Sequence, residues 1–109
     1  MSLTDLRKKI DNRTAKLTVI GLGYVGLPLA ATLADCGFHV LGVDVKAWRV
    51  ETVNKGENPI GGEEPGLNEL INKNVASGSL QATGDYADLH DRDVVFVNVE
   101  TPVGDDHKP

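Results

Sequence analysis

Short apolar runs alternate with amphipathic segments along most of this chain. Runs rich in Val, Ile and Leu predict buried strands, and segments that repeat apolar residues every three or four positions predict helices. The expected strands are residues 17–20, 39–43, 80–83 and 94–99, and the expected helices are residues 25–36, 46–54 and 67–77, with one helical turn at 85–89. The last strand is apolar at nearly every position, which indicates burial on both faces.

Strands that alternate with helices in this way are typical of a parallel sheet with right-handed crossovers. We therefore expect an α/β fold of the Rossmann type, a doubly wound parallel sheet truncated to about four strands where the full fold has about six. Residues 16–109 are expected to form this domain, incomplete at its C-terminus. Residues 1–15 are polar, with Leu3, Leu6 and Ile10 at helical spacing, and predict a helical arm.

Composition narrows the range of partners. The net charge is −5, which argues against nucleic acid or an anionic membrane, because both reward clustered Lys and Arg. The uncharged stretch between Lys16 and Asp35 approaches the length of a membrane span, but three glycines and a proline interrupt it, and a second strand follows directly. The single cysteine, Cys36, forms no internal disulfide. It fits a reducing compartment and therefore a cytoplasmic location.

The segment "GLGYVGLPLA", residues 21–30, lies between the first expected strand and the first long helix. Its G-x-G-x-x-G spacing is typical of a dinucleotide-binding turn. Gly21 allows the tight turn, Gly23 lets a pyrophosphate approach the backbone, and Gly26 lets the helix pack close to the strand. Pro28 suits the first helical turn, where N–H groups lack an intrahelical partner. The alternative is a structural turn without a ligand.

Asp44 follows the second expected strand, close to the spacing of about 20 residues that the dinucleotide fingerprint requires. A carboxylate there can accept both ribose hydroxyls of the adenosine half and repels a 2′-phosphate, so it predicts NAD rather than NADP. The alternative role is that of an N-cap for the next helix. Arg49 can reach the adenosine side or belong to a solvated helix face, and Lys46 is a second nearby cation.

The order of four segments resembles the UDP-glucose/GDP-mannose dehydrogenase family over about residues 16–109. These segments are "VIGLGYVGLPLA", "GVDVKAWRVETVNKGENPI", "EEPGLNELI" and "GSLQATGDYADLHDRDVVFVNVETP". The combination of Tyr24-Val25-Gly26-Leu27, Glu64-Pro65-Gly66-Leu67 and Thr101-Pro102 is more specific than the glycine spacing alone. The extra Gly61-Gly62-Glu63 and the polar N-terminal arm are most similar to the UDP-N-acetylmannosamine dehydrogenase branch.

The resemblance implies NAD-dependent oxidation of a UDP-sugar at C6, from alcohol to carboxylate in two hydride transfers, as in polysaccharide biosynthesis. The substrate is expected to be UDP-N-acetylmannosamine or a related UDP-hexose, and the enzyme a homo-oligomer. The resemblance assigns cofactor binding to Gly21, Gly23, Tyr24, Val25, Gly26, Asp44, Arg49, Thr101 and Pro102.

The resemblance also implies that the catalytic residues lie elsewhere. Family members trap the intermediate aldehyde on a cysteine, which is expected beyond residue 109 together with its lysine and acidic partners. The 109 residues alone are therefore expected to be inactive, with no catalytic residue and no metal site. Cys36 is not that cysteine, and its place near the end of a helix predicts a small buried apolar residue.

Two other functions compete with this interpretation. A 3-hydroxyacid or 6-phosphogluconate-type dehydrogenase opens with a similar GLGxMGxPxA segment, but lacks the counterpart of Glu64-Pro65-Gly66-Leu67. A non-enzymatic module that senses NAD for a partner protein requires only the cofactor-binding residues.

Overall fold

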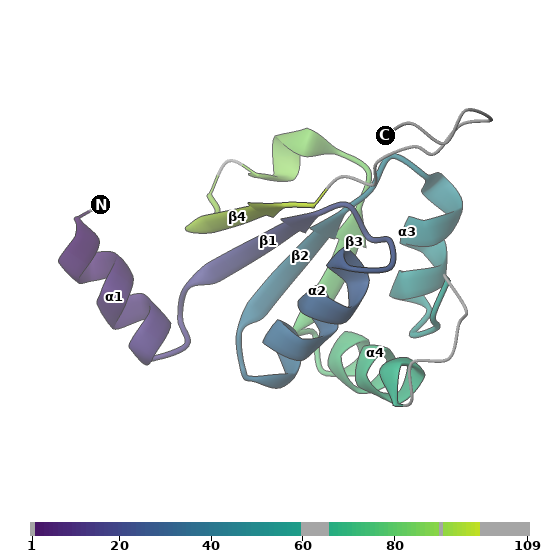
Figure 1. Ribbon diagram of the computed structural model, residues 1–109, viewed down its shortest axis with the longest axis horizontal. Coiled ribbons are helices and arrows are strands. Elements are labelled where there is room, and N and C mark those ends of the chain that lie inside the picture. Colours follow the sequence, from purple (N-terminus) through teal and green to yellow (C-terminus); the bar gives the residue numbers. More distant parts are fainter. Residues whose placement is uncertain (1, 60–65, 90, 99–109) are drawn as a thin grey trace.

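One parallel sheet organises the molecule (Figure 1). The computed structural model describes residues 2–59, 66–89 and 91–98. Its strands are β1 (Lys16–Ile20), β2 (His39–Val43), β3 (Leu80–Thr83) and β4 (Val94–Val97). They pair in parallel in the order β3-β2-β1-β4. This is the first part of the order expected for a Rossmann-type sheet, so the predicted fold class is confirmed.

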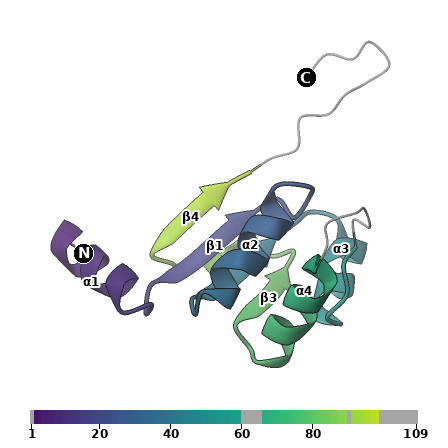
Figure 2. The ribbon, with the colours of Figure 1, turned by 60° about the horizontal axis from the view of Figure 1, so that its bottom comes forward.

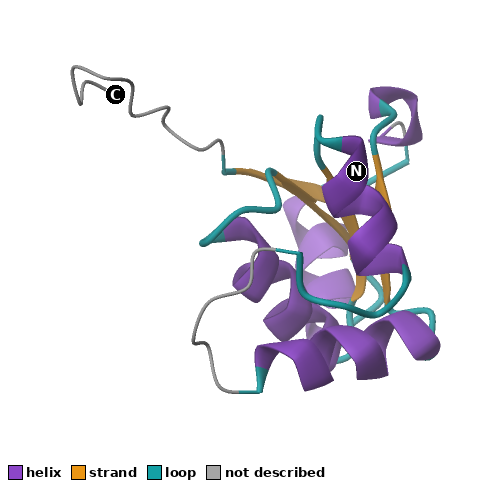
Figure 3. Ribbon diagram, turned by 90° about the vertical axis from the view of Figure 1, so that its right-hand side faces the viewer, coloured by secondary structure: helices purple, strands orange, loops and turns teal. Residues whose placement is uncertain are grey.

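The helices after residue 16 begin and end within one residue of the expected positions, and within the expected arm at 1–15 the helix spans Leu3–Asp11. The helices are α1 (Leu3–Asp11), α2 (Gly26–Asp35), α3 (Ala47–Asn54) and α4 (Leu67–Ala76), with a single 3-10 turn, η1 (Tyr86–Leu89). Helix α2 packs against β1, β2 and β3, and α4 packs against α2 (Figures 2 and 3). The core fills the space between the sheet and helices α2, α3 and α4, where Val19, Leu27 and Ile71 are fully buried.

The prediction that the last strand is buried on both faces is wrong. Val95, Phe96 and Val97 are 42%, 37% and 68% exposed, and only Val94 packs against the core. The reason is that the faces of β4 are poorly covered: helices α2, α3 and α4 pack against β1, β2 and β3, whereas β4 lies at an edge of the sheet and packs mainly against β1 among the described elements. A run of apolar residues indicates a preference for burial but does not specify which elements will cover it.

The opposite edge of the sheet is protected by a side chain. Asn54, at the end of α3, accepts a hydrogen bond from the Ala82 N–H and donates one to the Ala82 carbonyl, each at 2.9 Å. Its amide thus substitutes for the backbone of a further strand beside β3. Such covering of edge groups lowers the tendency to pair with another chain.

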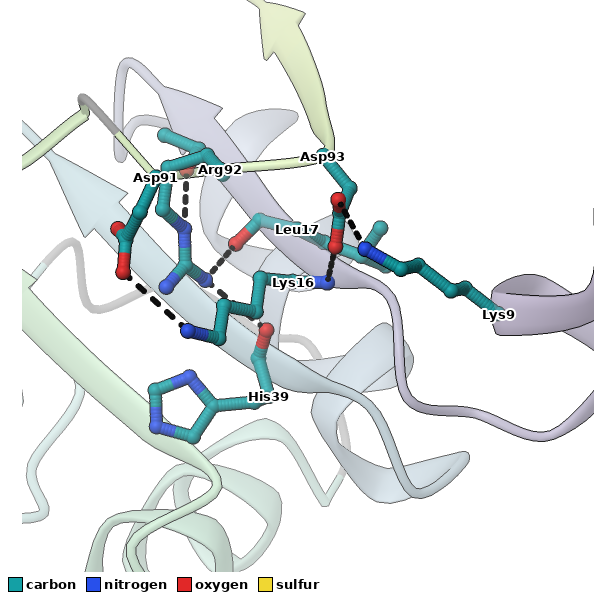
Figure 4. Close-up of polar contacts among 8 residues, drawn as sticks. Lys9, Lys16, Leu17, His39, Asp91, Arg92 and Asp93 are labelled. Atoms are coloured by element: carbon teal, nitrogen blue, oxygen red, sulfur yellow. Dashed lines mark hydrogen bonds and ion pairs between the residues drawn. The ribbon is translucent and has the colours of Figure 1, made fainter. Parts of the chain in front are cut away.

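Arg92 bridges the sheet strands just before β4 (Figure 4). Its Nε donates to the Thr18 hydroxyl at 2.9 Å, and its Nη2 donates to the carbonyls of Leu17 and His39 at 2.6 and 3.1 Å. Thr18 is fully buried. Burial lowers the pKa of Arg92 from its usual value, an effect that nearby Asp91 and Asp93 oppose.

Helix α1 is held to the sheet mainly through Asp93 (Figure 4). One carboxylate oxygen of Asp93 accepts from the Lys9 ammonium at 3.1 Å, and the other accepts from the backbone N–H of Lys16 at 2.8 Å. No residue of α1 is buried. The division into an arm at 1–15 and a domain at 16–109 stays a prediction. None of the helices in the described part of the chain is long and apolar enough to cross a membrane.

Candidate cofactor-binding site

The glycine turn connects the end of β1 to the start of α2. Gly21 has a φ of 97°, a conformation that side chains rarely adopt. A Cβ at Gly26, the first residue of α2, would overlap the Gly21 carbonyl oxygen and lie 2.9 Å from its carbon. Gly21 is therefore required by the backbone conformation of the turn, and Gly26 by the close approach of helix and strand, as the spacing predicts.

The turn leaves a row of backbone donors at the helix start. The first bond of the helix runs from the Leu27 N–H to the Gly23 carbonyl, at 3.1 Å. Within the described residues 2–59, 66–89 and 91–98, the backbone N–H groups of residues 23–26 donate no hydrogen bond. The side chains of Tyr24 and Val25 are 70% and 67% exposed. Free N–H groups together with the helix dipole suit a phosphate group.

Asp44 lies next to this turn and is only 5% exposed. One of its oxygens, Oδ1, accepts from the Lys46 N–H at 2.8 Å. The other, Oδ2, accepts from the Leu22 N–H at 2.8 Å and from Arg49 Nη1 at 3.3 Å. A carboxylate has about four acceptor sites, so Oδ1 retains the remaining capacity for a ribose hydroxyl. The predicted two-point ribose contact therefore requires Oδ2 to share or exchange a partner.

The surroundings of Asp44 keep it ionised. Burial raises its pKa, but the backbone N–H groups of Lys46 and Leu22 and the Arg49 guanidinium lower it by more, so that the pKa of Asp44 lies below its ordinary value. A negative charge thus stands at the end of β2 at neutral pH. The alternative that Asp44 caps the next helix is wrong, because Lys46 occupies the N-cap position of α3.

Arg49 is part of this cluster. Arg49 is buried, with 7% of its surface exposed. Its guanidinium pairs with Asp44, and its Cζ lies 5.4 Å from the centre of the Trp48 ring. The alternative of a solvated helix face is therefore wrong. The ion pair directs Arg49 toward Asp44, whereas Lys46 is exposed beside it.

Three residues near the turn were missed by sequence reasoning. Leu22 is fully buried, and its side chain occupies the space above Gly42 of β2. Asn98 donates its backbone N–H to the Ile20 carbonyl at 2.8 Å. Its amide nitrogen lies 3.3 Å from the position of a Cβ at Gly26. The signal in the sequence was the topology, because Asn98 directly follows β4, and the carboxyl end of β4 lies beside that of β1.

Three further predictions concern the cofactor sites at Thr101 and Pro102 and the burial of Cys36. Thr101 and Pro102 lie outside the described residues. Cys36 is exposed, so its expected burial is wrong. It is the C-cap residue of α2, where the chain leaves the helix toward solvent. Because α2 has ten residues, Cys36 lies about 15 Å from the glycine turn at the other end.

This arrangement can hold a dinucleotide. The free N–H groups suit a pyrophosphate, and the carboxylate beside them suits a ribose diol. These groups lie at the carboxyl ends of parallel strands, the end of such sheets at which ligands bind. Within the described residues, no group of three His, Cys, Asp or Glu side chains is placed to hold a metal ion.

Comparison with known proteins identifies what this geometry resembles. Residues 15–109 match the model of the UDP-glucose/GDP-mannose dehydrogenase family, NAD-binding domain. UDP-glucose 6-dehydrogenase from Bacillus subtilis is 42% identical over 87 residues, which are 79% of this chain and 19% of that protein.

Two solved structures extend the comparison. The ternary complex of GDP-mannose dehydrogenase from Pseudomonas aeruginosa aligns with a TM-score of 0.76 and 36% identity, over 84% of this chain and 21% of that one. The UDP-N-acetyl-mannosamine dehydrogenase from Staphylococcus aureus aligns with a TM-score of 0.73 and 38% identity, over the same shares. This chain therefore spans about a fifth of the length of the relatives it matches.

Proposed function

Since this chain belongs to the UDP-glucose/GDP-mannose dehydrogenase family and its cofactor is NAD, we propose that it forms the NAD-binding portion of a nucleotide-sugar 6-dehydrogenase. The observation that carries the proposal is that two features lie together at the carboxyl ends of β1 and β2. Free N–H groups of residues 23–26 lie at the start of α2, and the ionised Asp44 bonds to Leu22 of the same turn.

The residues fit the two halves of an ADP group. Gly23, Tyr24, Val25 and Gly26 hold the pyrophosphate through their N–H groups, and Gly21 shapes the turn that presents them. Asp44 binds the adenosine ribose through Oδ1, and Arg49 keeps the carboxylate in place. Thr101 and Pro102 are proposed to lie beside the nicotinamide half. When bound, NAD supplies the acceptor for hydride from the sugar alcohol.

The proposed substrate is UDP-N-acetylmannosamine or a related UDP-hexose, used in polysaccharide biosynthesis in the cytoplasm. The matched relatives are named for UDP-glucose, GDP-mannose and UDP-N-acetylmannosamine. Support for the third comes from the extra Gly61-Gly62-Glu63 segment and the polar N-terminus of this chain. The family match argues against a 3-hydroxyacid or 6-phosphogluconate-type dehydrogenase.

We expect the 109-residue chain to bind NAD without oxidising a UDP-sugar. Its single cysteine lies at the far end of α2 from the glycine turn, so no thiol is placed to trap an aldehyde beside a bound cofactor. The measurement combines calorimetric titration with NAD and an absorbance assay for NADH with UDP-N-acetylmannosamine or UDP-glucose. NADH formation above a buffer control contradicts inactivity, and a chain that takes up no NAD contradicts the proposed function.

We also expect the purified chain to self-associate, most simply as a dimer through β4. Phe96 and Val97 on this edge strand are exposed, while the edge at β3 is covered by Asn54. Light scattering after size exclusion at high micromolar concentration measures the mass. The control is Val97→Lys, which places a charge on the edge and should shift the chain toward monomer. A monomeric unmodified chain is the opposing result.

A further inference from the structure

Gly42 occupies a position where a glycine is unexpected. It lies in β2, paired with Val19 of β1 on one side and Ala82 of β3 on the other. A glycine inside a strand weakens it, because the unfolded chain gains freedom and no side chain packs. The φ angle of Gly42 is also not in the positive range that favours glycine. Its backbone conformation therefore suits any residue, and the reason for a glycine must be space.

The space is taken by the side chain of Leu22. A Cβ built on Gly42 would lie 2.7 Å from Leu22 Cδ2, 2.9 Å from Cδ1 and 3.3 Å from Cγ. Separations below 3.0 Å force a displacement. Leu22 is fully buried, so its side chain has no open solvent to rotate into, and a close-packed interior passes the strain on.

The same strand also holds the backbone of Leu22. Asp44, two residues after Gly42, accepts the Leu22 N–H at 2.8 Å through Oδ2. Leu22 is therefore fixed at both ends by β2, through its side chain over Gly42 and through its N–H at Asp44. It stands between Gly21 and Gly23, so its placement sets where the following N–H groups of the turn lie.

We infer that Gly42 and Leu22 are positioning residues for the pyrophosphate subsite, acting as a fitted pair across the turn and β2. This inference rests on the proposed function, in which the N–H groups of residues 23–26 hold the pyrophosphate. Neither residue touches the phosphates through a side chain. Their contribution is to fix the positions of the N–H donors of residues 23–26 relative to the sheet, as binding of a rigid anion requires.

The test uses Gly42→Ala, Leu22→Val and the double variant in the full 109-residue chain. Leu22→Val removes both δ carbons, the two atoms nearest to a new Cβ. We expect Gly42→Ala to weaken NAD binding at least tenfold in calorimetric titration, and the double variant to bind within about threefold of Leu22→Val. The control is Leu80→Val, a truncation in the core at the other end of the sheet, which should leave NAD affinity unchanged.

A second readout separates this inference from the proposed function. Amide hydrogen exchange at Leu22 reports its bond to Asp44 without any cofactor. We expect faster exchange in Gly42→Ala and restored protection in the double variant. A chain that binds no NAD would overturn the proposed function, and the Leu22 exchange rates would still decide whether the pair positions the turn.

The outcomes that overturn the pairing are specific. Gly42→Ala with unchanged NAD affinity and unchanged Leu22 exchange is one of them. If Gly42→Ala does not fold, the double variant decides, because it should fold and bind NAD once the δ carbons are gone. A double variant that stays unfolded while Leu22→Val folds also overturns the inference.

Discussion

Replacement of Gly26 by Ala is expected to lower the free energy of unfolding by about 3 kcal/mol or more, the upper end of overpacking costs in a core, and to abolish measurable NAD binding. A Cβ at this position overlaps the Gly21 carbonyl oxygen. The obstruction is backbone, so no side chain can rotate to relieve it. Relief requires α2 to move away from β1, which opens the core and displaces the N–H groups of residues 23–26. Denaturant unfolding and NAD titration measure the two effects.

The matched control is Gly84→Ala. Gly84 has no positive φ, and a Cβ there would meet only the Asp44 carbonyl oxygen at 3.5 Å, an ordinary contact. We expect this variant to change the unfolding free energy by no more than about 0.5 kcal/mol and to bind NAD normally. A Gly26→Ala chain as stable as the Gly84→Ala chain would contradict the required close approach of helix and strand.

The unmodified chain is expected to bind NAD at least about tenfold more tightly than NADP. The ionised Asp44 offers Oδ1 to a ribose hydroxyl and repels a 2′-phosphate, and a hydrogen bond to a charged group is worth about 1.5–3 kcal/mol. Lys46 opposes this preference but is exposed, and the guanidinium of Arg49 pairs with Asp44. Calorimetric titration with each cofactor measures the ratio, and equal or tighter binding of NADP contradicts the role of Asp44.

The choice of variant matters for this test. Asp44→Ala alone leaves the buried Arg49 without its carboxylate partner, and breaking a buried ion pair costs about 3–5 kcal/mol. The better variant is Asp44→Ala combined with Arg49→Ala, which removes both charges together. We expect this chain to lose the preference for NAD. The control is Glu51→Ala, which removes an exposed carboxylate from α3 and should leave the cofactor ratio unchanged. A double variant with the original ratio contradicts the assignment.

The architecture could be predicted because it depends on local patterns in the sequence. Alternating strand and helix periodicities predict a parallel sheet, and the spacing of Gly21, Gly23 and Gly26 predicts the turn between them. The distance along the chain to Asp44 follows from the same rule, because a helix and a short turn separate the ends of consecutive strands. These features depend on residues near one another in sequence or on the length of a crossover.

Other features depended on which strands and side chains meet. The sequence by itself determined the order of elements, the glycine turn and the presence of a carboxylate after β2. Only the tertiary structure decided that β4 is an exposed edge, that Arg49 is buried against Asp44, and that Gly42 makes room for Leu22. Leu22 and Gly42 are separated by 20 positions in the printed sequence. Their contact arises from the register of β2 beside β1 and the path of the turn, which no periodicity along one segment records.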